Sequence, residues 1–139
     1  MDKSLFRMRR LHDVFGGYID AADYQQRLSD YRNVLIEWND NLNRYRALYV
    51  FSFNPVSGSQ PAAIGGAEPC SSSFEDIARG FRDAHYELQK LIDKKSDASA
   101  EKTQGLLDTL HVCIYFLDEK MLSNIRDRKA AFNDKITNR

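Results

Sequence analysis

Apolar and polar positions follow a helical period through most of this chain. In the longest stretch, aromatic and leucine side chains recur at alternating intervals of four and three residues: Tyr24, Leu28, Tyr31, Leu35, Trp38, Leu42, Tyr45 and Tyr49, with Ser52 as a polar last member. A heptad stripe sustained over about four repeats is typical of a long helix of the coiled-coil kind, packed along one face. Asp20 is placed to cap its start, and Asn54-Pro55 to end it, because a residue before proline avoids the helical conformation.

Three further stripes predict three more helices. The first consists of Leu5, Met8, Leu11 and Phe15, the second of Phe74, Ile77, Phe81, His85, Leu88 and Ile92, and the third of Leu107, Leu110, Ile114, Leu117, Met121, Ile125, Arg128, Phe132 and Ile136. Gly16-Gly17 separates the first helix from the long one, as a turn or as a kink. Asp97 or Ser99 can cap the last helix, and the short connection at residues 96–100 predicts an antiparallel hairpin.

Residues 54–73 contain all three prolines and three of the glycines, with Glu68 as their one charge. This composition predicts a flexible loop, either functional or disordered. The chain, residues 1–139, is therefore predicted to be a single all-α domain: an antiparallel four-helix bundle with one long heptad-patterned helix and a flexible Pro/Gly/Ser loop. Ala47–Phe53 and Leu110–Leu117 would also suit buried strands, so an α/β fold is the alternative. Helix is favoured because the stripes continue through both segments in phase.

Charge and cysteine content indicate which partners and which cellular compartment to expect. Twenty basic and twenty acidic residues cancel, so the whole molecule has no electrostatic preference for nucleic acid or an anionic membrane. Basic residues do concentrate at both ends, which keeps contact of the termini with nucleic acid or another anionic partner as an alternative. No apolar run approaches the ~20 residues of a membrane span. With only Cys70 and Cys113, and no secretory signal at the start, we expect a reduced, cytoplasmic protein without membrane association.

The common catalytic and cofactor motifs are absent from the sequence, including phosphate-binding glycine loops and zinc-protease or esterase signatures. Asp108 and His111 stand three apart on a predicted helix, a spacing that carboxylate-bridged metal sites use in duplicate. No second copy of the pair occurs, and the chain has only three histidines. We therefore predict no metal site and no cofactor.

Arg79 and His85 form an Arg-x5-His arrangement, and Arg7 and His12 an Arg-x4-His arrangement. The first resembles the Arg-x(4–6)-His motif of HEPN-type ribonucleases and of the companions of nucleotidyltransferases, over seven residues. The resemblance implies that Arg79 holds a phosphate and that His85 transfers a proton. The polar residue that usually follows the arginine is replaced by Gly80. A ribonuclease or nucleotidyltransferase companion is thus an alternative function, whereas the place of His85 in an apolar stripe favours a core role.

Excess apolar residues give the main functional hypothesis. The segments Ala47–Phe53 and Leu110–Leu117 are apolar on nearly all sides of the predicted helices. Their apolar residues outside the stripes form the predicted interface: Val50, Phe51, Phe53, Val112, Tyr115 and Phe116. The alternative is that both segments pack on each other inside the bundle. Asn39, in a polar stretch of the long helix, is expected to fix register across the bundle or to contact a partner helix. The sequence thus predicts a non-enzymatic protein-interaction or assembly module, either a homo-oligomer or a small subunit of a larger complex.

Overall fold

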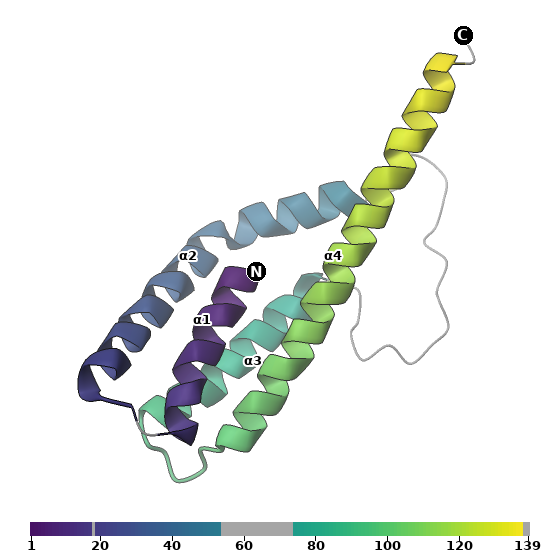
Figure 1. Cartoon of the computed structure of the whole chain (residues 1–139). Helices are drawn as coiled ribbons and strands as arrows, with labels where there is room; N and C mark the ends of the chain where they lie inside the picture. The colour runs from purple at the N-terminus through teal and green to yellow at the C-terminus, as the bar shows by residue number, and fades with distance from the viewer. Residues whose placement is uncertain (18, 54–73, 138–139) are drawn as a thin grey trace.

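The computed structural model of the chain describes residues 1–17, 19–53 and 74–137. These residues form α1 (Asp2–His12), the short 3-10 helix η1 (Asp13–Gly16), α2 (Ala21–Phe53), α3 (Phe74–Ile92) and α4 (Ala100–Thr137). The four α-helices pack as a bundle (Figure 1), which confirms the all-α prediction. No strand occurs in the described ranges, so the α/β alternative is wrong. The predicted loop at 54–73 lies outside the described residues.

The helix ends use the capping groups that the sequence offers. The backbone N–H of Asp23 donates to Asp20 Oδ1 at 2.9 Å, so Asp20 caps α2, and the N–H of Lys102 donates to Ser99 Oγ at 3.1 Å, so Ser99 caps α4. Gly17 has an extended backbone, with φ −149° and ψ 171°. The Gly16-Gly17 break is therefore a turn between two separate helices, not a kink within one.

The backbone at the end of α3 adopts a conformation that the sequence does not predict. Lys94 has φ 53°, in the left-handed region, and the N–H of Lys95 donates to the carbonyl of Lys90 at 3.0 Å. This is the hydrogen-bond pattern of a Schellman cap, in which glycine usually takes the left-handed position. The cap turns the chain from α3 into the connection that leads to α4.

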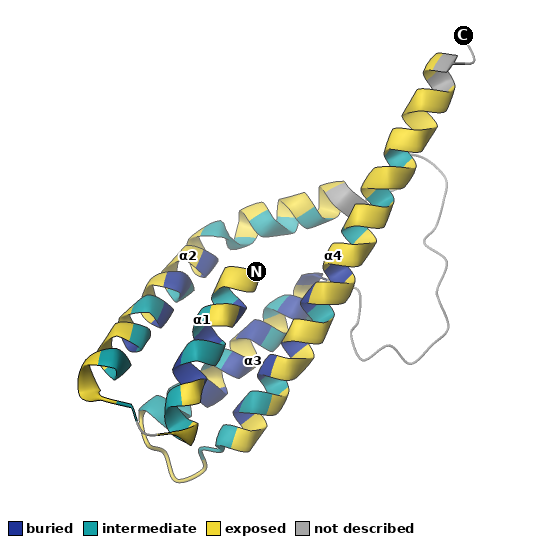
Figure 2. Ribbon diagram, in the orientation of Figure 1, coloured by how far each residue is buried: buried dark blue, intermediate teal, exposed yellow. Residues whose placement is uncertain are grey.

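The core lies where α1 packs against both α2 and α4, and where α3 packs against α4 (Figure 1). Gly80 allows α3 and α4 to approach closely, because a Cβ atom there would lie 2.7 Å from Leu110 Cδ2. The predicted stripes supply most of the core, which comprises Leu5, Met8, Leu11, Leu28, Tyr31, Trp38, Ile77, Phe81, Ala84, Leu88, Leu107, Leu110, Ile114 and Leu117. The buried residues end at Trp38 on α2 and Leu117 on α4, although both helices continue further (Figure 2).

Two findings bear on the predicted setting of the protein. Among the helices in the described ranges, none has a stretch that is both long and apolar enough to cross a membrane. Cys113 is disulfide-bonded, so the expectation of reduced cysteines is wrong at this residue. Because disulfides persist mainly in oxidising compartments, the predicted cytoplasmic location loses its support from cysteine usage.

Candidate functional site

The second half of α4 projects beyond the bundle (Figure 1), and most of its surface is exposed (Figure 2). We call this segment, Leu122–Thr137, the arm. The last fully buried residue of α4 is Leu117, and Met121 is only partly buried against the core. In the part of the chain that the structure describes, no helix therefore packs along the arm as α1 and α3 pack along the first half of α4.

One face of α4 carries an exposed heptad stripe that runs onto the arm. Its seven positions alternate by three and four residues, and we call them the outer stripe: Tyr115, Asp118, Leu122, Ile125, Lys129, Phe132 and Ile136. The five apolar members are between 47% and 64% exposed. The sequence pattern assigned Ile125, Phe132 and Ile136 to the same stripe as the buried Leu107 and Leu110. The structure separates them, since only the residues up to Met121 face the core.

The end of α2 lies beside the arm. Phe51 is 72% exposed, and the guanidinium carbon of Arg128 lies 5.8 Å from the centre of its ring. Leu48 and Val50, one turn or less away, are about half exposed as well. We define the arm surface as the outer stripe together with Leu48, Val50 and Phe51. It is a candidate for protein contact, formed by two helices that are distant in sequence and that meet where Arg128 lies beside Phe51.

The predicted interface residues are exposed wherever their side chains are described. Val112, Tyr115 and Phe116 are between 38% and 59% exposed on α4, and at the end of α2 Val50 is 51% and Phe51 72% exposed. The side chain of Phe53 lies outside the described residues. The alternative in which the two apolar segments cover one another inside the bundle does not match this exposure. Periodicity missed Ile125, Phe132 and Ile136 as surface residues because it placed them in the core stripe, and it left the exposed Leu122 unassigned.

A groove with a volume of about 310 Å³ opens between α2 and α3, with Ser4 and Met8 of α1 contributing to its wall. These two helices approach each other less closely than the other neighbouring pairs of the bundle. Trp38 and Phe81 meet across its base, with ring centres 4.4 Å apart. The groove is thus an apolar trough on the bundle itself, formed by elements other than the arm.

Polar contacts bridge α2 and α3 at two places along the groove. Arg46 donates to both carboxylate oxygens of Glu75, at 2.8 and 3.4 Å. Further along, the Tyr31 hydroxyl bonds to His85 Nδ1. Burial raises the pKa of Tyr31 and lowers the pKa of His85, so the hydroxyl keeps its proton and the imidazole stays neutral. Tyr31 is therefore the donor and Nδ1 the acceptor, which leaves the ring proton of His85 on Nε2.

The groove rim carries charge that is only partly compensated. Arg79 forms an ion pair with Asp76 at 3.1 Å. Arg82, one turn further along α3, makes no ion pair or hydrogen bond with a described residue, and the exposed side chain of Asn39 on α2 makes none either. Asn39 was predicted to fix register or to contact a partner, and it lies at the groove rim.

Arg79 and His85 both line the groove but stand at different points along it. Six residues of a helix rise by about 9 Å, so the two side chains do not share one turn. The other Arg–His arrangement has structural partners: Arg7 pairs with Asp30 at 2.5 Å, and the buried His12 donates from Nε2 to the carbonyl of Ala100 at 2.8 Å.

Most basic residues of α1 are compensated inside the fold. Lys3 pairs with Glu37 at 2.6 Å and Arg9 with Asp108 at 2.5 Å, in addition to the pair of Arg7 with Asp30. Most of the basic residues near the N-terminus therefore form ion pairs that join α1 to α2 and α4. Asp108 is engaged in this way, and the described residues contain no group of three potential metal ligands.

One buried charged residue, Glu87, was not predicted from the sequence. Glu87 of α3 is 5% exposed, and it accepts hydrogen bonds from Lys102 at 2.6 Å and from Lys90 at 3.4 Å. Lys90 also reaches Asp97 in the connection between α3 and α4, at 2.6 Å. The hydrogen bond from Lys102 holds the pKa of Glu87 below its usual range, against the opposing effect of burial. This network fastens the start of α4 to α3 and has a structural role.

No family model, curated protein or solved structure matches this chain. Any statement about function therefore rests on the two features that the fold leaves open, the arm surface and the groove.

Proposed function

We propose that this chain is a helical protein-interaction and assembly module that pairs with a second copy of itself through the arm surface. The observation that carries this proposal is the outer stripe, a heptad row of large apolar side chains about half exposed on a helix that extends past its own bundle. Monomeric proteins rarely expose large contiguous apolar patches. Heptad spacing is also the pattern by which two helices pack side by side.

The two charged positions of the outer stripe specify how two copies would align. Asp118 and Lys129 have opposite charge, and neither forms an ion pair with a described residue. Two α4 helices running in opposite directions can place each Asp118 against Lys129 of the second copy. The same register places Leu122 against Ile125 and Tyr115 against Phe132 of that copy. Polar residues within an apolar seam are a known device for fixing register.

The surroundings of Asp118 support this register. Partial burial, and after it the nearby carboxylate of Asp2, raises the pKa of Asp118; the N-terminal ammonium opposes this shift, and Glu119 adds to it slightly. The ionised carboxylate is therefore disfavoured in a single chain, and a lysine ammonium from a second copy would relieve this. The resulting contact is self-complementary, as a two-fold symmetric interface requires.

Charge reversal at the two positions tests the proposal. Asp118→Lys and Lys129→Asp should each weaken self-association at least about tenfold, because each variant brings like charges together twice in its own dimer. An equimolar mixture of the two variants should recover dimers, because every facing pair is then opposite in charge. Light scattering on each sample and on the mixture measures this directly.

Asp127→Lys is the matched control. It makes the same charge change on the arm, but two residues past Ile125 and on the opposite side of the helix, so it should leave the dimer intact. A wild-type chain that stays monomeric at high concentration would refute self-association. Dimers that persist in both single variants, or a mixture that fails to restore them, would refute the register.

A further inference from the structure

The groove between α2 and α3 has the composition of a ligand site. Its base is apolar, with Trp38 and Phe81 in contact, and its rim carries polar groups with unused hydrogen-bonding capacity on both helices. Small-molecule sites combine these two features, and their volumes begin near 300 Å³. The volume of about 310 Å³ therefore fits a small ligand. A peptide helix, about 10 Å across, needs a longer trough.

The rim charge selects the sign of that ligand. The groove is lined by three arginines and a single carboxylate, that of Glu75, while His85 is neutral. Glu75 compensates Arg46, and Asp76 compensates Arg79. The guanidinium of Arg82 remains available, and it offers several N–H donors in the fixed geometry that suits carboxylate, sulfonate or phosphate oxygens.

We propose that this groove binds a small molecule with a flat apolar body and one anionic group. The body lies over the Trp38–Phe81 contact, between Leu35 and Leu42, and the anionic group bonds to Arg82. The amide of Asn39 donates a second hydrogen bond from the α2 side. This site is independent of the arm surface, because it uses no residue of the outer stripe.

A dye pair tests the proposal with the full chain. Anilinonaphthalene sulfonate has an apolar aromatic body and one anionic group, and N-phenylnaphthylamine is its uncharged counterpart. Trp38 is the only tryptophan of the chain and lines the groove, so its fluorescence reports occupancy directly. The anionic dye should bind with one saturable site per chain and quench Trp38. Arg82→Gln should weaken its binding about tenfold and leave the uncharged dye unaffected, because a hydrogen bond to a charged group is lost.

Two controls separate this site from the arm and from general charge. Arg126→Gln removes an exposed arginine of the arm and should change nothing, and Leu122→Ser should leave dye binding intact even where it weakens self-association. Ala78→Leu fills the groove and should exclude both dyes; if circular dichroism shows that this variant unfolds, the Arg82→Gln comparison decides alone. Equal affinity of wild type and Arg82→Gln for the anionic dye, or loss of binding in Leu122→Ser, overturns the proposal.

Discussion

Replacing Phe51 by lysine gives the sharpest test of the arm surface. The Phe51 ring is 72% exposed and lies beside Arg128, which immediately precedes the outer-stripe residue Lys129. A lysine at this place removes an apolar contact and adds a cation next to two others. We choose lysine because a glutamate would find Arg128 as a partner and so conceal the effect.

The expected size follows from the exposed surface of the ring. Full burial of a phenylalanine is worth roughly 1.5–3 kcal/mol, so about 1–2 kcal/mol remains to be gained when a partner covers the exposed part. A symmetric dimer contains the change twice, which makes the loss about 2–4 kcal/mol. At about 1.4 kcal/mol per tenfold, the dissociation constant should rise at least about 30-fold. Folding loses only one cation–π contact, so the free energy of unfolding should change by less than about 1 kcal/mol.

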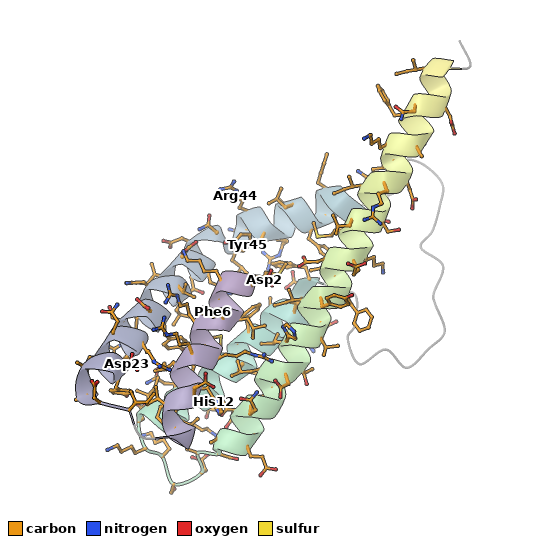
Figure 3. The ribbon with its side chains drawn as sticks, in the orientation of Figure 1. Asp2, Phe6, His12, Asp23, Arg44 and Tyr45 are labelled. Atoms are coloured by element: carbon orange, nitrogen blue, oxygen red, sulfur yellow. The ribbon has the colours of Figure 1, made fainter. Side chains whose placement is uncertain are left out.

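Light scattering over a range of concentrations measures association, and thermal unfolding followed by circular dichroism measures stability. Phe6→Lys is the control: Phe6 is 58% exposed on α1 (Figure 3), and Arg7 lies 5.8 Å from its ring centre. The two sites match in residue type, exposure and cationic neighbour, and they differ in being beside the arm or on the bundle. An unfolded Phe51→Lys protein, equal dissociation in both variants, or a dimer that survives the change would each refute the reasoning.

Three further predictions concern the bundle and the groove. The pKa of Glu87 is lower in the folded chain than its usual value of 4.5, so the ionised carboxylate stabilises the fold at pH values above 4.5. This stabilisation is lost as the pH falls through the folded-state pKa. The unfolding temperature should therefore drop in acid, and Glu87→Gln should flatten this dependence. Lys94→Gly should raise the free energy of unfolding by about 0.5–1 kcal/mol, measured by urea titration, because glycine adopts the left-handed cap without strain. His85→Ala should lower the free energy of unfolding by about 1–3 kcal/mol, since the buried Tyr31 hydroxyl loses its partner, whereas Arg79→Ala should not. Loss of RNA cleavage in both variants at unchanged stability would instead support the ribonuclease alternative.

The stripe pattern predicted the helices because a helix that buries one face needs apolar residues at intervals of three and four. The Tyr24 to Tyr49 stripe does face the core or its edge, and the caps at Asp20 and Ser99 form as expected. Spacing fixes which face of a helix is apolar, but it does not fix how far apart two helices lie. The groove was therefore not predictable, and neither was the contact between Tyr31 and His85, since both depend on the separation of α2 and α3.

The sequence pattern did not predict the arm, although the lengths of the helices explain why it forms. An α-helix rises about 1.5 Å per residue, so the 38 residues of α4 span roughly 57 Å, whereas the 19 residues of α3 span roughly 29 Å and the 11 of α1 roughly 17 Å. The two helices packed along α4 are too short to cover its length. In a straight helix a heptad stripe also drifts around the axis by about 20° per repeat. One row of apolar residues in the sequence thus becomes two rows in space, an inner one that faces the core and an outer one that does not.

This mismatch in length also favours a second copy as the natural cover for the arm. An unrelated partner would need its own complementary charges at the positions facing Asp118 and Lys129, whereas a second copy in the opposite direction supplies both at once. In the proposed register, Leu122–Ile136 of each α4 lies against residues 111–125 of the other, so each copy covers the overhang of its partner. The end of α2 reaches α4 beside Arg128 and so extends the contact sideways through Phe51. The proposed antiparallel pair would thus use both the overhang of α4 and the opposite charges of Asp118 and Lys129, and it would leave neither arm uncovered.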